Sequence, residues 1–440
     1  MRIEKAPVLS ERLNHLAFEK INNNERLFDL VNEINDEYLY WDKVKYKKIP
    51  SNISHDDLWS IVKFYRFIKQ RIVSFGNYSF RFNILPNVEK VLHEIDMKYG
   101  GQLQSNGTLY NFEKREYLVS SIMEEAISSS QIEGAVTTRK VAKEMLRQQR
   151  APRNKSERMI LNNYQTIRFI RQNSDKPLSA GILLEIQKSM TSGTLDDLND
   201  EGRFRSNDEV RVIDSTDNEV VHQPPSARNL KTLMSDLFQF FNEEDKNLFT
   251  HPVVKASIIH FMIGFIHPFV DGNGRTARAL FYWYLLKRGY WLTEYLSISS
   301  IILKTRVQYA KAFLYTETDD NDLTYFINYK IKTLQLAYEN LQVYLHRKLE
   351  EKKLASNFLS LGGINERQAK IIRVLIDDPD KIITVKEIET MFSVSNQTAR
   401  FDLHGLEKMK LIRSSFINKK KQVFSRSTDF NQQLKTLEER

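Results

Sequence analysis

A histidine, a carboxylate and two arginines lie close together in the segment HPFVDGNGRTAR, which runs from His267 to Arg278. A neutral imidazole, whose unperturbed pKa is roughly 6.5, can take the proton of an incoming hydroxyl group. Pro268 disfavours helical geometry at the residue before it, so we expect a helix to end at His267 and the ring to project from that end. These features make His267 the candidate general base.

The turn Asp271–Gly274 follows the histidine and has little side-chain bulk. We expect a second helix from Arg275, and a turn before a helix exposes backbone N–H groups where the helix dipole also favours an anion. Arg275 and Arg278 are neighbours on one face of that helix, and their planar guanidinium groups suit phosphate oxygens. The segment therefore predicts a binding site for a polyphosphate.

Asp271 is a single carboxylate, which is too few ligands for a metal site made by protein alone. Mg²⁺ usually takes one or two carboxylates and completes its coordination shell with phosphates and water. The chain contains no cysteine, which excludes disulfides, thiolate metal sites and a cysteine nucleophile. The implied cofactors are a nucleotide, ATP, and Mg²⁺. The predicted chemistry is nucleotidyl or phosphoryl transfer.

The segment resembles the motif of the Fic family, H-P-F-x-D/E-G-N-G-R-x-x-R, at every defined position. This resemblance implies a protein adenylyltransferase, which transfers AMP from ATP to Ser, Thr or Tyr hydroxyl groups of target proteins and of itself. It also implies a role for each motif residue: His267 as base, Asp271 for Mg²⁺, Gly272, Asn273 and Gly274 around the α-phosphate, Arg275 and Arg278 on the β- and γ-phosphates, and Phe269 buried to fix the loop.

A second motif, SSQIEG at Ser129–Gly134, resembles the inhibitory motif S/T-x-x-x-E-G/N of the same family. We expect a helix from about Glu113 that Gly134 terminates, which places Ser129 and Glu133 on one face. The resemblance implies that Glu133 pairs with Arg278 and holds the enzyme in check. An ordinary solvated helix end is the alternative interpretation of this pattern.

The stretch Val210–His222 predicts a β-hairpin, because VRVI and EVVH flank a polar tract. Together with Gln223–Pro225, it resembles the family's flap, where an extended segment of the protein substrate would dock by strand pairing. The loop Asp214–Asn218 is acidic and does not match the glycine-rich flaps of the family. Target preference therefore stays open.

Apolar residues recur mostly at helical spacing, which predicts a mainly α fold. We expect a helical region at 1–107, a Fic domain at 108–360 with the inhibitory helix at about 113–134 and the flap at about 210–222, and a separate domain at 364–440. Within the first region, helical patterns cover Asn14–Tyr38 and Asp57–Ser74. A seam at Leu323–Leu345 favours a long helix packed on its own domain, and a homodimer is left open.

The segment after Gly363 predicts a winged helix-turn-helix, with Thr384 capping the first helix of the pair. The wing would be the basic loop Asn418–Lys421, and DNA or a protein is the expected partner. The second helix should point four polar residues outward: Asn396, Gln397, Arg400 and His404. We expect Asp402 and Glu407 on the same face, where they would reduce its positive charge.

The net charge of +9 favours an anionic partner such as a nucleotide or nucleic acid. No apolar segment is long enough to span a bilayer, since the longest unbroken stretch is Ala279–Leu286, so we expect a cytoplasmic protein without membrane contact. His260, on an apolar helix, is expected to be a core residue. Two alternatives to adenylyl transfer remain: removal of AMP or transfer of a related group, and a DNA-binding regulator whose Fic domain acts as a sensor.

Overall fold

The computed structural model describes most of the chain in two compact units, Met1–Leu341 and Gln342–Arg440. Its secondary structure is mainly helical, with short strands in three small antiparallel sheets. No helix among the described residues is long and apolar enough to cross a membrane. The described residues are 3–7, 24–51, 53–97, 111–214, 218–245, 249–360, 363–379, 381–417 and 421–438.

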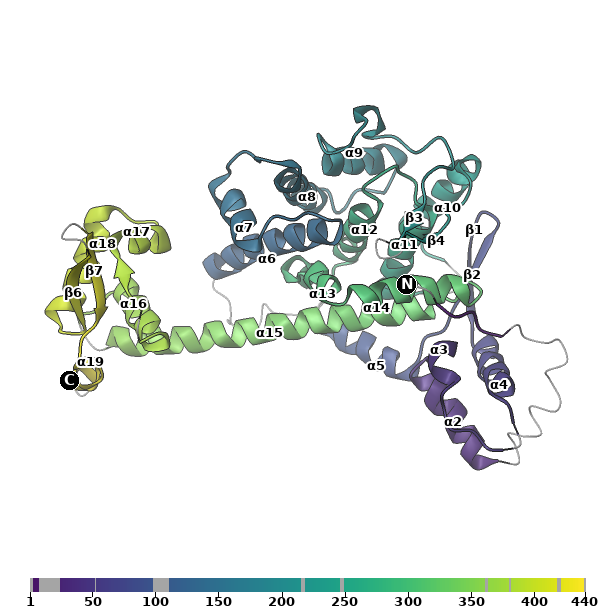
Figure 1. Ribbon diagram of the computed structural model, residues 1–440, viewed down its shortest axis with the longest axis horizontal. Helices are drawn as coiled ribbons and strands as arrows, with labels where there is room; N and C mark the ends of the chain where they lie inside the picture. Colours follow the sequence, from purple (N-terminus) through teal and green to yellow (C-terminus); the bar gives the residue numbers. More distant parts are fainter. Residues whose placement is uncertain are drawn as a thin grey trace. The chain divides into compact units, whose positions relative to one another are not determined.

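The first unit holds the catalytic motif and is labelled in Figure 1. Its elements are α2 (Glu25–Asp36), α3 (Trp41–Val44), α4 (His55–Ile68), β1 (Arg71–Phe75), β2 (Tyr78–Phe82), α5 (Pro86–Ile95), α6 (Asn111–Ile132), α7 (Arg139–Gln148), α8 (Lys155–Gln172), α9 (Ala180–Thr191), β3 (Val212–Ile213), β4 (Val220–His222), α10 (Leu230–Asn242), α11 (Pro252–Ile266), α12 (Asn273–Lys287), α13 (Ile298–Lys304), α14 (Arg306–Thr318) and the first part of α15 (Thr324–Ser360).

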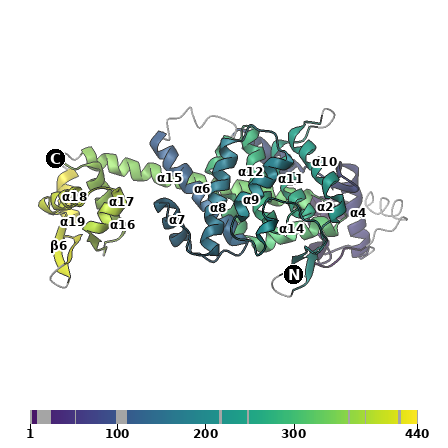
Figure 2. The ribbon, with the colours of Figure 1, turned by 90° about the horizontal axis from the view of Figure 1, so that it is seen from above.

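Helix α11 is the core of this unit. It begins at Pro252, whose fixed φ suits the first helical position, and the His251 ring caps it by accepting the N–H of Val253 at 3.2 Å. Nearly all its side chains are buried, so the helix is covered on every side. α12 packs directly on it, with α6, α8 and α9 packed around α12 (Figures 1 and 2).

The end of α6 explains why Glu133 is held in place. Gly134 takes φ +92°, the N–H of Ala135 bonds Ser130 O at 3.0 Å, and the N–H of Gly134 bonds Gln131 O at 3.2 Å. These two hydrogen bonds form a Schellman motif, and they confirm the predicted termination of the helix by Gly134. Glu133 therefore sits at the helix C-terminus, where the dipole disfavours a carboxylate unless a cation compensates.

The prediction of a helix through Ser74 was wrong at its end. α4 stops at Ile68, and β1 and β2 form a hairpin with Phe75 opposite Tyr78. Its two-residue turn begins with Gly76 at φ +55°, as a type II′ turn requires. The hairpin supports α11, because the aromatic rings of β2 pack edge-on against those of α11. The ring centroids are 5.3 Å apart for Tyr78 and Phe265, 5.9 Å for Phe80 and Phe261, and 5.1 Å for Phe80 and Phe265.

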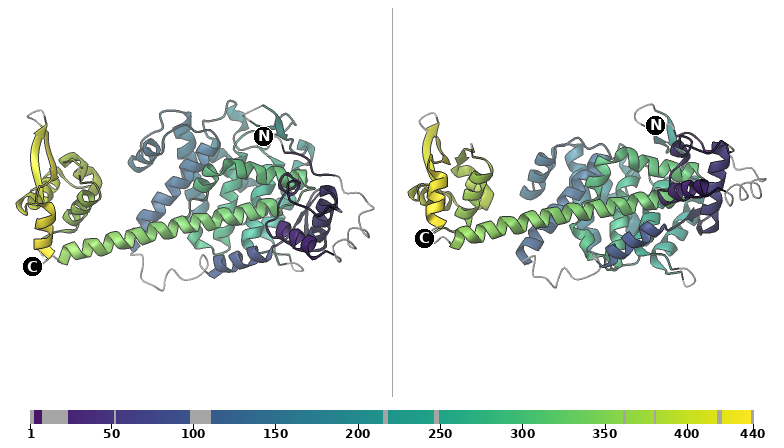
Figure 3. Two further views of the ribbon diagram at one scale, coloured as in Figure 1. Left: turned by 60° about the horizontal axis from the view of Figure 1, so that its bottom comes forward. Right: turned by 90° about the horizontal axis from the view of Figure 1, so that it is seen from below.

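Helices α2, α3 and α4 form a small core of their own at the N-terminal side of this unit (purple in Figure 3). α2 lies within the predicted pattern Asn14–Tyr38, whose first residues are outside the described ranges. Buried Lys63 of α4 pairs with Asp319 at 2.9 Å, and Tyr38 donates to Asp322 at 2.7 Å. These contacts join the N-terminal helices to the segment that precedes α15.

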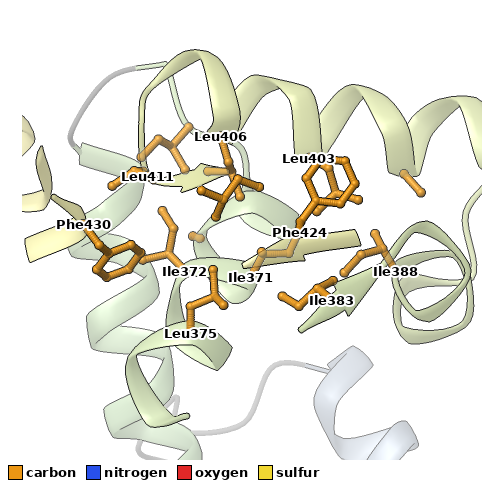
Figure 4. Packing of buried hydrophobic residues seen from close by; sticks show 14 of the residues in the cluster. Ile371, Ile372, Leu375, Ile383, Ile388, Leu403, Leu406, Leu411, Phe424 and Phe430 are labelled. Carbon is orange, nitrogen blue, oxygen red and sulfur yellow. The ribbon is translucent and has the colours of Figure 1, made fainter. Parts of the chain in front are cut away.

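The second unit contains, after the rest of α15, a helical and β-sheet fold with its own core (Figure 4). Three strands form an antiparallel sheet in the order β5–β7–β6. Thr384 Oγ1 caps α17 by accepting the N–H of Glu387 at 3.2 Å, as expected. The elements are α16 (Glu366–Asp377), β5 (Ile383–Thr384), α17 (Val385–Phe392), α18 (Asn396–Lys408), β6 (Ile412–Ile417), β7 (Lys421–Arg426) and α19 (Phe430–Glu438).

This order of elements is the one expected of a winged helix-turn-helix, with most of the predicted wing loop outside the described residues. α18 exposes the four predicted polar residues, Asn396, Gln397, Arg400 and His404. The expectation for Asp402 was wrong, because this carboxylate is fully buried and accepts from Arg367 Nη2 at 3.1 Å and from Asn365 Nδ2 at 2.7 Å. A charge that cannot be solvated is thus paired inside the unit rather than facing the proposed partner.

Candidate active site

His267 lies at the C-cap of α11, as predicted, but in an unexpected conformation. The residue takes φ 50° and ψ 58°, in the left-handed region, whereas a proline at the next position usually imposes extended geometry. Its N–H bonds Ile263 O at 3.0 Å. Its Nδ1 lies 3.1 Å from Gly264 O, and because a carbonyl only accepts, Nδ1 carries the proton. Nε2 is therefore the nitrogen able to accept a proton.

Burial lowers the pKa of His267 to about 4, with His222 and Arg205 acting in the same direction. The bond to Gly264 O and the charge of Glu133 oppose this effect without cancelling it. The ring is thus neutral at neutral pH. A neutral Nε2 is the state that a general base needs.

The loop after His267 is held rigid by Asn273 and Phe269. Asn273 Nδ2 donates to Phe269 O at 2.8 Å, and Phe269 N donates to Asn273 Oδ1 at 3.0 Å. The Phe269 ring is fully buried and stacks on Phe204, with centroids 5.5 Å apart, which confirms its predicted burial. Since both ends of the Asn273 amide are engaged here, its side chain braces the loop, and its contribution near a phosphate would come from its backbone.

The N-terminus of α12 has no side-chain cap. Its N-cap is Gly272, at φ +87°, which offers no side-chain cap to the first backbone N–H groups of the helix. These groups belong to Asn273, Gly274 and Arg275, and they carry the positive end of the helix dipole. The backbone therefore has the donors that the predicted phosphate site needs, and phosphate binding stays a prediction.

Arg275 lies deeper than the sequence indicated. Its side chain is buried, with Nη1 donating to Met190 O at 2.9 Å and Nη2 to Asp271 Oδ2 at 3.3 Å. Nε has no hydrogen-bond partner among the described residues. In this structure Arg275 orients Asp271, and direct contact with the β- or γ-phosphate stays a prediction.

Arg278 reaches the site from the next turn of α12 and binds the end of α6. Nε donates to Ser129 Oγ at 2.8 Å, while Nη2 donates to Ser129 O and to Glu133 Oε1, both at 2.9 Å. Its Nη1 is buried and has no hydrogen-bond partner among the described residues. The structure thus pairs Glu133 with Arg278, as the resemblance implied, and adds two bonds from Arg278 to Ser129.

Glu133 approaches the same anion site at Gly274. A Cβ added at Gly274 would clash with Glu133 Oε1 and lie 3.2 Å from Arg278 Nη1. Although burial raises the pKa of the Glu133 carboxyl, Arg278 and Arg275 outweigh this effect and lower it overall. An ionised carboxylate therefore occupies the mouth of a site whose donors suit phosphate.

Asp271 has the properties of a Mg²⁺ ligand at this site. Its side chain is half exposed, next to the open N-terminus of α12. No group of three or more His, Cys, Asp or Glu side chains among the described residues could hold a metal by itself. A single carboxylate fits a cation that takes its other ligands from phosphate and water, so the residues suit Mg²⁺ bound together with a nucleotide.

The flap and its anchors complete the site. β3 and β4 pair antiparallel as predicted, with Val212 opposite His222 and Ile213 opposite Val220. His222 is buried, its Nδ1 lies 2.6 Å from Glu317 Oε2, and its Nε2 donates to Phe265 O at 2.8 Å.

Sequence reasoning gave no role to His222 and did not identify Arg205, whose guanidinium bonds His267 O at 2.9 Å. Neither belongs to a local motif, so only the tertiary contact reveals them. His260 is buried and bonds the hydroxyl of Tyr309 through Nε2 at 2.8 Å, as expected of a core residue.

Fold and site together define a helical protein with a histidine beside a helix N-terminus that has no side-chain cap. Residues 177–285 match the model of the Fic/DOC family. The chain is 44% identical over 69 residues to the protein adenylyltransferase Fic of Drosophila mojavensis and 42% identical over 69 residues to that of Drosophila grimshawi. The segment 177–285, which contains His267 and the N-terminus of α12, is thus similar to the Fic/DOC family.

These similarities cover part of each protein. The aligned stretch is 16% of this chain and 14% of each Drosophila relative. Among solved structures, a Fic family protein from Desulfovibrio desulfuricans G20 is 21% identical, with TM-score 0.48 over 78% of this chain and 95% of that chain. Fic-1 (aa134–508) from C. elegans is 17% identical, with TM-score 0.48 over 76% of this chain and 88% of that chain. The family match at 177–285 contains the catalytic motif and flap but does not reach Glu133.

Proposed function

We propose that the chain is a protein adenylyltransferase that transfers AMP from ATP to hydroxyl side chains of target proteins and of itself. One observation carries this proposal: a short loop joins a neutral histidine at the end of α11 to the uncapped N-terminus of α12, the helix that also carries the Arg278 guanidinium. The activity named for the Drosophila relatives supports it.

In the proposed step, the target hydroxyl oxygen attacks the α-phosphorus of ATP and Nε2 of His267 takes its proton. One P–O bond forms to the target, the P–O bond to the β-phosphate breaks, and diphosphate leaves with the electron pair. Mg²⁺ held by Asp271 would neutralise charge on the phosphates. Arg278 and the N–H groups of α12 would orient the polyphosphate.

The low pKa of His267 in the free protein fits this step. Bound phosphates bring negative charge near the ring, and negative charge raises the pKa of a histidine. The base would therefore become more basic only when ATP is present. Proton transfer would be favoured in the complex that can use it.

A target segment would dock along the flap by strand pairing. The flap sheet has two strands, so each strand keeps an edge that no other strand of the sheet covers. The cross-strand pair Ile213 and Val220 is exposed, at 53% and 47%. An extended segment with an apolar side chain at the matching position would cover both features.

Glu133 would inhibit this reaction by holding Arg278. A carboxylate at the N-terminus of α12, paired with the buried guanidinium, competes with the terminal phosphates of ATP for the same donors. ATP would then bind with its α-phosphorus poorly aligned for attack. Activation would require that Glu133 leave Arg278.

Incubation with ATP labelled on the α- or the γ-phosphate tests the proposal. Protein-bound label should come from the α-phosphate only, require Mg²⁺ and disappear in His267→Ala, which should still bind ATP because Asp271, Arg278 and the loop remain. Label from the γ-phosphate would show kinase activity instead. If Glu133 instead activates water for AMP removal, AMP-modified target would lose its label with the parent chain and keep it with Glu133→Gly.

The C-terminal unit supports a second candidate function, DNA binding. α18 presents Asn396, Gln397, Arg400 and His404 to solvent, and these side chains can reach base edges and phosphates. Binding of the full chain to duplex DNA should weaken steeply as salt rises, and Arg400→Ala should reduce it. Absence of salt-dependent binding would favour a protein partner at this unit.

A further inference from the structure

The C-terminal end of α11 leaves its last four carbonyl groups without partners in the helix itself. His267 satisfies two of them: its N–H bonds Ile263 O, and its Nδ1–H bonds Gly264 O. His267 makes both bonds while its own backbone is left-handed. The orientation of the base is thus coupled to the way this helix ends.

The other two carbonyls are capped by residues on either side of the flap loop. Phe265 O accepts from Nε2 of His222, at the end of β4, at 2.8 Å. Ile266 O accepts from Nη2 of Arg205, which precedes β3, at 3.4 Å. The flap segment is therefore anchored at both ends to the helix end that carries the base.

Arg205 makes more hydrogen bonds to the end of α11 than His222 does. Its side chain is only 1% exposed, so its donors need protein acceptors. The guanidinium donates to His267 O at 2.9 Å, Ile266 O, Pro225 O, Asn207 O at 2.7 Å and Asp208 Oδ1 at 3.2 Å.

The backbone of Arg205 adds a bond on the far side of His267. Its N–H donates to Pro268 O at 2.9 Å, so one residue binds the carbonyls of His267 and Pro268. A residue with a Cβ rarely adopts φ 50° before a proline unless its surroundings impose it. Arg205 is the residue placed to impose it.

We infer that Arg205 is a positioning residue, which holds His267 in its left-handed conformation and fixes the flap relative to the base. It acts through His267 and is not placed to touch substrate. The inference rests on the proposed role of His267 in adenylyl transfer.

The flap side of this link runs through Pro225 and Asp208. Asp208 accepts from Arg205, from Ser226 Oγ at 2.8 Å and from the N–H of Ala227 at 2.6 Å, so the two ends of the flap segment meet at this guanidinium. A target segment paired with the flap is thereby set at a fixed distance from Nε2 of His267. Precise placement of the nucleophile is what an in-line attack requires.

Arg205→Lys tests the inference, because lysine keeps the charge but cannot serve several carbonyls with one planar fork. The control is Arg203→Lys, two residues before Arg205, since Arg203 is exposed and pairs with Asp200 on the same segment. Self-modification at saturating ATP should fall about 100-fold in Arg205→Lys, as expected of a displaced catalytic group. ATP affinity should stay within about twofold and Tm near the parent value, since ATP contacts lie on α12.

The pH profile and the imidazole titration distinguish positioning from general support. In Arg205→Lys the His267 ring should become more exposed to water, so its pKa should rise from about 4 toward the ordinary value of a histidine. In Arg203→Lys the pKa of His267 should be unchanged. NMR titration of His267 reads this shift directly, without activity. If transfer is absent in every variant but the shift occurs, the proposed function fails and the positioning role stands.

Two results would overturn the inference. One is that Arg205→Lys transfers AMP and titrates like the parent; the other is that its rate, ATP affinity and Tm all fall together, as a general loss of stability would cause. If Arg205→Lys does not fold, Asp208→Asn replaces it, because Asp208 is half exposed and its change weakens the bond from Arg205 Nη1 and the link to Ser226 and Ala227, while the bonds from Arg205 to the helix end remain. A smaller rate loss with the same direction of titration shift is then expected, and no change in either would refute the positioning role.

Discussion

Replacing Glu133 with glycine should activate the enzyme. Glu133→Gly removes the carboxylate at the mouth of the anion site and frees Nη2 of Arg278 for a phosphate. The remaining bonds from Arg278 to Ser129 keep the guanidinium beside Gly274. The variant should therefore bind ATP in the aligned pose and transfer AMP faster.

The expected size follows from the one bond that is lost. A hydrogen bond to a charged group contributes about 1.5–3 kcal/mol. The Glu133 side chain is 25% exposed, so water screens part of this interaction and the lower half of the range applies. Each ~1.4 kcal/mol recovered in the barrier is about tenfold in rate, so activation of about 10- to 40-fold is expected.

Self-modification with α-labelled ATP, at equal enzyme concentrations, measures this effect. Gln131→Gly is the matched control, because it places a glycine in the same last turn of α6 without touching Arg278. Arg278→Ala should not activate, since it removes the phosphate clamp together with the lock. Equal labelling in Glu133→Gly and the parent, at equal ATP affinity, would refute the competition between Glu133 and phosphate.

Three further outcomes are expected. The kcat/KM for ATP should stay flat from pH 8 to about 5 and fall only through about 4, because the depressed pKa keeps His267 neutral until then; an acid limb near pH 6.5 would contradict this. Gly274→Ala should abolish transfer, because its Cβ would crowd Arg278 and the helix N-terminus where the phosphates are proposed to bind, and Glu133→Gly should not rescue it. A fully active double variant in a labelling assay would contradict this expectation. Removal of 363–440 should leave a folded, self-modifying enzyme, as measured by circular dichroism and labelling, because buried Leu341 and the earlier part of α15 remain; an insoluble or inert product would contradict it.

The local parts of the site could be predicted from the sequence. Pro268 and Gly134 punctuate helices at known positions, so the helix ends carrying His267 and Glu133 followed from residue type and spacing. The flap also followed, because apolar residues flank its polar loop. These signals lie within a few residues of the feature that they predict.

Long-range contacts could not be predicted in this way. Arg205 meets the His267 carbonyl across 62 residues, and no periodicity in the chain indicates such a bond. The left-handed backbone of His267 has the same origin, because tertiary contacts override the local preference before a proline. The β1–β2 hairpin is a different case, because a local signal for it exists: Gly76 lies in a turn between two stretches rich in β-forming residues. The helical spacing of apolar residues in the same region was given more weight.

The mass of the intact protein after reaction tests the central claim most directly. Glu133→Gly and Glu133→Gly/His267→Ala would each be incubated with ATP and Mg²⁺ and measured by mass spectrometry. We expect the first variant to gain adenylyl groups, whereas the second, which keeps Arg278 and the anion site, should gain none. A phosphoryl group in place of an adenylyl group, or equal adenylylation of both variants, would contradict it.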